Sequence, residues 1–164
     1  MAFNVNQLGK LDRAVAIGGG LAFIAGFLPW WGYRGPHSIY VPSVSGWNAG
    51  FAAVAGMLLM AAAAAYLVLR RAEVKLPELP VGPAVAVAGA SLIGLGLVVL
   101  KWLTLPRIGP RLGGSIGPRF GIWLAMIGGV VELVGAVGLF RGSGESLPWE
   151  QAPPPSPPPP PRAE

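Results

Sequence analysis

Residues 120–140 read FGIWLAMIGGVVELVGAVGLF, an apolar run with one acidic residue, Glu132, near its middle. A helix of about 20 apolar residues, at about 1.5 Å per residue, covers the roughly 30 Å hydrocarbon core of a bilayer. The chain has three further stretches of this kind, at residues 14–33, 47–69 and 81–100. The sequence therefore predicts an all-α fold, a four-helix transmembrane bundle made of two helical hairpins.

The composition is typical of a membrane protein. Hydrophobic residues make up 53% of the chain and charged residues 12%, whereas soluble domains are about 25% charged. The connections between the apolar stretches are shorter than the roughly 50 residues of a small domain, so we expect one transmembrane domain at residues 14–140 and a cytoplasmic segment at residues 1–13. The chain has no cysteine and no residue pattern typical of a metal, cofactor or catalytic site. We therefore expect no cofactor and no enzymatic activity.

The net charge of +5 comes from lysines and arginines, most of which flank the apolar stretches. At such positions we expect membrane lipids, and no nucleic acid, as partners. Lysine and arginine are in excess on the cytoplasmic side of membrane proteins. With both termini in the cytoplasm, six of these residues near the spans lie inside and five outside. The cluster of Arg70, Arg71 and Lys75 thus favours a multi-pass protein of the cell membrane with cytoplasmic N- and C-termini.

Five of the six tryptophans are predicted to lie at the membrane face opposite the termini. They are Trp30, Trp31, Trp47, Trp102 and Trp123. An indole ring favours the headgroup region because its apolar body carries a hydrogen-bond donor. We therefore predict an interfacial aromatic belt, with a partner-docking surface as the alternative.

Glu132 is the one acidic or basic side chain deep within a predicted span. Gly128 and Ala136 lie four residues to either side of it, so the carboxyl is expected to face the bundle interior. Ser91 lies at a similar depth in the third span and is the predicted partner. Two interpretations fit: a neutral, hydrogen-bonded structural acid, or a proton or cation relay, because burial disfavours the ionised form and intramembrane acids often mark ion pathways.

The connection before the fourth span is basic and repeats the motif Ile-Gly-Pro-Arg, at residues 108–111 and 116–119. The basic residues here are Lys101, Arg107, Arg111 and Arg119. They are candidates for contact with the phosphates of anionic lipid or with an acidic envelope polymer. Headgroup contact without specificity is the alternative interpretation.

Small residues recur at helical spacing within the spans. Examples are Gly18, Ala22 and Gly26 in the first span and Ala86, Ala90 and Gly94 in the third. Lipid tails provide no hydrophobic force between helices, so we expect close contact through small residues to hold the bundle together.

Residues 141–164 differ in composition from the spans, and most of residues 153–161 are prolines. Proline fixes φ and cannot donate a backbone hydrogen bond, which favours an extended, solvated chain. We therefore expect a disordered, proline-rich C-terminal tail that acts as a spacer or tether.

Three short motifs resemble those of a known group of proteins. They are Phe27-Leu28-Pro29-Trp30, Ser45-Gly46-Trp47 and Gly121-Ile122-Trp123-Leu124. Over about residues 10–141 the chain resembles the small, uncharacterised four-span integral membrane proteins of actinobacteria. The resemblance implies the four-span fold and brings no activity or site residues with it.

These observations favour a protein that acts by binding. We expect a non-enzymatic accessory or scaffold component of a cell-envelope membrane complex, which binds other membrane-protein subunits or a second copy of itself. The alternative is a small proton- or cation-coupled transporter subunit that uses Glu132.

Overall fold

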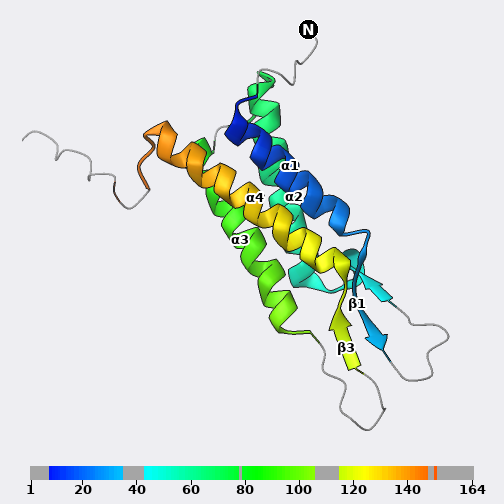
Figure 1. Ribbon diagram of the computed structural model, residues 1–164. Helices are drawn as coiled ribbons and strands as arrows, with labels where there is room; N and C mark the ends of the chain where they lie inside the picture. Colours follow the sequence, from blue (N-terminus) through cyan, green and yellow to red (C-terminus); the bar gives the residue numbers. More distant parts are fainter. Residues whose placement is uncertain (1–7, 35–42, 78, 106–114, 148–149, 151–164) are drawn as a thin grey trace, which may run out of the picture.

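Four antiparallel helices make up most of the structure. The computed structural model describes residues 8–34, 43–77, 79–105, 115–147 and 150. Within these residues the helices are α1 (Lys10–Ala25), α2 (Phe51–Arg71), α3 (Pro83–Leu103) and α4 (Phe120–Ser143). Figure 1 shows them running alternately in opposite directions, so that α1 and α3 begin, and α2 and α4 finish, at one end of the bundle. We call this end the N-terminal end. The prediction of a mostly helical, four-helix protein is confirmed.

Three of the described helices, α2, α3 and α4, are long and apolar enough to cross a membrane. Helix α1 has 16 residues, which is about 24 Å at about 1.5 Å per residue. It ends at Ala25 because the chain turns towards Pro29, which has no N–H and disfavours a helical conformation in the residue before it. The stretch at residues 14–33, expected to be one helix, is therefore helical only as far as Ala25.

A small antiparallel sheet covers the other end of the bundle, which we call the sheet end. Its strands are β1 (Pro29–Arg34), β2 (Ser43–Ser45) and β3 (Ser115–Pro118), in the order β2-β1-β3. The central strand pairs with β3 through Trp31 opposite Pro118, and with β2 through Trp31 opposite Val44. A short 3-10 helix, η2 (Gly46–Asn48), leads from β2 towards α2. The sheet, which extends away from the helices in Figure 1, corrects the all-α prediction and joins the connection between α1 and α2 to the connection between α3 and α4.

Two pairs of helices approach each other backbone to backbone at glycines. A Cβ atom at Gly18 of α1 would lie 2.5 Å from the carbonyl oxygen of Gly128 on α4, and a Cβ at Gly128 would lie 2.7 Å from that of Gly18. Gly56 of α2 and Gly94 of α3 make the same reciprocal contact, at 2.7 and 2.9 Å. Only glycine, which has no Cβ, allows two helix backbones to approach this closely. These contacts hold α1 against α4 and α2 against α3.

The core has two apolar clusters. The cluster nearer the sheet end includes Trp30, Met57 and Ile122, all fully buried. The cluster nearer the N-terminal end includes Val15 and Leu67. Along both α3 and α4, the polar residues discussed below lie between these two clusters.

The end of α4 is fixed to the start of α3. Helix α4 continues to Ser143 and is followed by Gly144 in the left-handed conformation, with φ 68°. The Oε2 atom of Glu145 then accepts hydrogen bonds from the backbone N–H groups of Ala84 and Val85, at 3.0 and 3.1 Å. A carboxylate is stabilised at this position by the helix dipole. The chain thus stays in contact with the bundle beyond residue 141, where the sequence predicts the tail to begin, and the proline run lies outside the described residues.

Candidate functional site

Glu132 and Ser91 meet in the middle of the bundle. Both side chains are fully buried, and Ser91 Oγ on α3 donates a hydrogen bond to Glu132 Oε1 on α4 at 2.8 Å. The two residues are 41 positions apart in sequence and come together because α3 and α4 are antiparallel neighbours. The structure therefore brings together the acid and the hydroxyl that the sequence places at one depth.

The second carboxyl oxygen of Glu132 faces α1. A Cβ atom at Gly19 would lie 3.3 Å from Glu132 Oε2, and the backbone of Gly18 is in contact with the backbone of Glu132. Oε2 is buried and has no hydrogen-bond partner among the described residues. A buried polar oxygen without a partner is costly, so this atom is the most unusual chemical feature of the interior.

The chemistry open to this pair is limited by its surroundings. Within the described ranges, no group of three histidine, cysteine, aspartate or glutamate side chains could hold a metal ion. Neither Glu132 nor Ser91 lines any of the three best-defined cavities in the described part of the chain. Gly19 does line one of them, a groove of about 290 Å³ between α1 and α2. The carboxyl is thus close to this groove but does not open into it.

Trp30 corrects the predicted aromatic belt. It is fully buried, and its Nε1 donates a hydrogen bond to the carbonyl oxygen of Ala25 at 2.9 Å. The ring packs against Gly46 and Gly121, where a Cβ would lie 2.6 and 2.7 Å from indole atoms. The side chain of Trp30 thus reaches back from β1 to the end of α1, and its indole lies in the interior of the protein.

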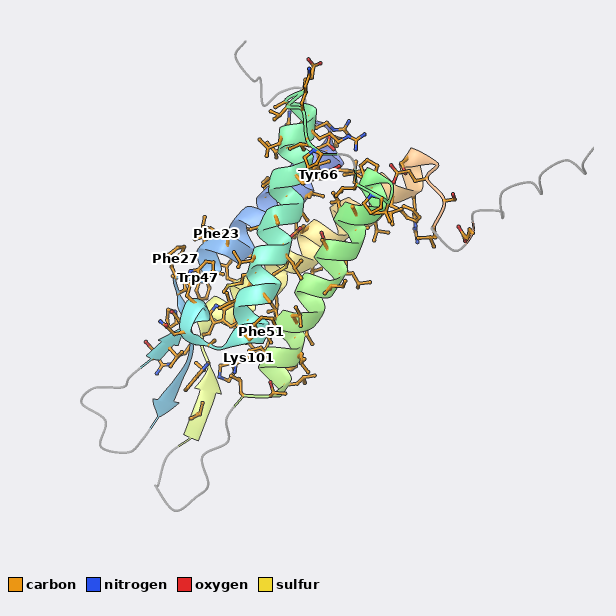
Figure 2. All side chains as sticks on the ribbon, turned by 180° about the vertical axis from the view of Figure 1, so that it is seen from behind. Phe23, Phe27, Trp47, Phe51, Tyr66 and Lys101 are labelled. Atoms are coloured by element: carbon orange, nitrogen blue, oxygen red, sulfur yellow. The ribbon has the colours of Figure 1, made fainter. Side chains whose placement is uncertain are left out.

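The other four tryptophans also lie at the sheet end. Trp102 and Trp123 form an edge-to-face pair with ring centroids 5.7 Å apart, and Trp123 is 44% exposed. Trp31 and Trp47 are partly buried, and the Nε1 atoms of both have no partner among the described residues. Trp47 also contacts Phe23 and Phe27 edge to face, a three-ring cluster that Figure 2 shows beside the start of α2. This cluster was not predicted from the sequence.

The structure describes two of the four basic residues of the connection before α4, Lys101 and Arg119. Arg107 and Arg111 lie outside the described residues. Lys101 is in the last turn of α3, at the sheet end in Figure 2. Arg119 is the N-cap residue of α4, and its backbone N–H donates to the carbonyl oxygen of Trp30 at 2.7 Å. Its backbone therefore helps to join this connection to β1.

One ion pair at the N-terminal end was not predicted. Arg71 Nη2 at the end of α2 lies 3.0 Å from Asp12 Oδ1 in the first turn of α1. Asp12 is buried, and its Oδ2 also accepts a hydrogen bond from the backbone N–H of Gly9 at 3.1 Å. An acid three residues after the N-cap residue, here Gly9, is a known signal of a helix N-terminus and could have been recognised in the sequence.

Comparison with known proteins does not show a family for this chain. No protein-family model, curated protein or solved structure matches it. The resemblance to four-span actinobacterial membrane proteins therefore stays a prediction.

Proposed function

We propose that this protein is a non-enzymatic, four-span protein of the cell membrane that acts by binding, as an accessory or scaffold component of a cell-envelope membrane complex. The observation that carries the proposal is the filled interior. Trp30, Met57, Met60 and Ile122 are fully buried between the helices, and Glu132 lines none of the three cavities described above. A packed bundle of this kind holds surfaces in place, whereas transport needs a route past the central polar groups.

The placement in the membrane forms part of the same proposal. An even number of antiparallel helices leaves both termini on one side, and the basic pair Arg70 and Arg71 lies at that end of the bundle. Basic residues favour the cytoplasmic side. We place the sheet on the outer side, and the shorter α1 completes the bundle as a fourth span.

The outward face of α3 is the surface that fits a partner helix best. This helix has the lowest buried share of the three candidate spans, 22%. A Cβ added at Gly89 or at Gly96 would meet no atom within 4 Å, so both glycines lie open on the surface. The two are seven residues apart, or about two helical turns, and so share one face. Exposed small residues let a second transmembrane helix approach closely.

Replacing Gly96 by valine is expected to abolish co-purification of a partner while the protein itself stays folded. The added side chain meets open space within the chain but would separate a helix docked on α3. The measurement is cross-linking in membranes, followed by affinity purification in mild detergent. Gly20→Val on α1 is the matched control, since a Cβ at Gly20 also meets no atom within 4 Å.

A stoichiometric partner that is lost only in the Gly96→Val variant supports the scaffold function on α3. A second copy of the chain captured in the same way identifies self-association as its form. Wild-type protein that purifies without any cross-linked component contradicts the proposal.

The second candidate function is a proton- or cation-coupled transporter subunit, and the unpartnered Oε2 of Glu132 is the observation that favours it. Under the scaffold proposal, Glu132→Gln is expected to leave stability within about 1 kcal/mol of the wild type, because the amide oxygen can still accept from Ser91. Proteoliposomes containing a pH-sensitive dye measure the other possibility. Proton flux in the wild type that disappears in Glu132→Gln establishes the transporter and rejects the scaffold.

A further inference from the structure

A cavity of about 400 Å³ lies at the N-terminal end of the bundle. Its apolar wall includes Leu11, Leu67, Val87 and Leu139. Its polar lining includes Tyr66, Arg70, Arg71 and Glu145. A second hollow of about 540 Å³, under the connection between α2 and α3, is also lined by Tyr66 and Arg70. Figure 2 shows Tyr66 at the opposite end of the bundle from Trp47 and Lys101. Tyr66 and Arg70 therefore line both hollows.

The charged groups around this cavity differ in whether they already have partners. Arg71 is paired with Asp12, and the carboxylate of Glu145 is bound to the first N–H groups of α3. Arg70 forms no ion pair with any described residue, and its Nη1 donates to the neutral hydroxyl of Tyr66 at 3.4 Å. The cavity thus retains one guanidinium group whose charge is not neutralised by the described residues.

This combination of a cation and an apolar wall fits an amphipathic anion. Arginine donates paired hydrogen bonds to phosphate oxygens, and a tyrosine hydroxyl adds a third donor. Arg70 lies in the last turn of α2, so in the proposed orientation it reaches the depth of the headgroups on the cytoplasmic side, where anionic lipids attract basic residues.

We propose that this cavity binds one anionic phospholipid. Arg70 and Tyr66 hold the headgroup phosphate, and the wall formed by Leu11, Leu67 and Leu139 accommodates the start of an acyl chain. The site is at the opposite end of the bundle from Lys101 and Arg119. It goes beyond the proposed scaffold function and does not depend on the partner bound at α3.

The test is native mass spectrometry of the full chain in detergent, titrated with phosphatidylglycerol. Arg70→Gln is expected to weaken binding about tenfold, as for the loss of a charge-assisted hydrogen bond. Tyr66→Phe is expected to cause a smaller loss without any change in charge. Arg141→Gln is the matched control, since Arg141 is exposed at the same end of the bundle and does not line the cavity. It is expected to leave binding unchanged.

Two further ligands separate the possible sources of the phosphate. Phosphatidylcholine tests the requirement for net negative charge, and inorganic phosphate tests whether the acyl chain matters. Equal loss of binding in Arg70→Gln and Arg141→Gln would show diffuse surface attraction and overturn the proposal. So would equally tight binding of phosphatidylcholine, or full competition by inorganic phosphate at the concentration of the lipid.

Discussion

Replacing Gly18 by alanine is expected to destabilise the bundle by about 1–3 kcal/mol, the usual cost of overpacking a tight core. The new Cβ would lie 2.5 Å from the backbone oxygen of Gly128 and from the backbone nitrogen of Glu132. Neither atom can rotate away, so α1 and α4 have to separate. The measurement is equilibrium unfolding in mixed micelles with increasing sodium dodecyl sulfate.

Gly20→Ala is the matched control on the same helix. A Cβ at this position meets no atom within 4 Å, so the change is expected to be neutral or to stabilise the helix by up to about 1 kcal/mol. Gly128→Ala disrupts the same contact from the α4 side. In the double variant, the losses of stability from Gly128→Ala and Gly18→Ala are expected to add only partly. Equal effects at Gly18 and Gly20 would mean that α1 does not pack on α4 through this contact.

Two reciprocal backbone contacts between helices join the first half of the chain to the second. The Gly18–Gly128 contact links α1 with α4, and the Gly56–Gly94 contact links α2 with α3. The sheet does the same, because β1 pairs with β3. The two predicted helical hairpins therefore do not pack as separate units. Residues from both halves of the chain form one shared core.

The helices were predictable because length and hydropathy are local properties of the chain. The sheet was not, because residues 29–33 continue an apolar run and the strand β3 that pairs with β1 lies far along the sequence. Proline at residue 29 was the local signal of a helix end. The helical part of the first predicted span accordingly ends at Ala25, a few residues before this proline.

The candidate site was partly predictable for the same reason. Counting residues from the helix ends gives a depth, and depth alone places Ser91 opposite Glu132. The approach of Gly19 to Glu132 and the fixing of Glu145 on α3 depend on how helices rotate about their axes and on where the chain turns. Those features follow from tertiary packing, which composition and spacing do not specify.

Replacing Trp30 by alanine is expected to cost about 3–5 kcal/mol, the range for large-to-small changes at buried aromatic residues. The ring is fully buried and fills the space between Gly46 and Gly121. Its removal leaves a cavity between the sheet and the helices, and it also removes the hydrogen bond to Ala25. The same unfolding titration in mixed micelles measures the loss.

Two variants separate the contributions of Trp30. Trp30→Phe keeps most of the volume and loses the indole donor, so its expected cost is about 1 kcal/mol. Trp123→Ala is the positional control, because this tryptophan lies at the same end of the bundle but is 44% exposed, and its truncation removes much less buried surface. A cost for Trp30→Ala no larger than that for Trp123→Ala would place Trp30 among the headgroups, and β1 would then not cover the end of the core.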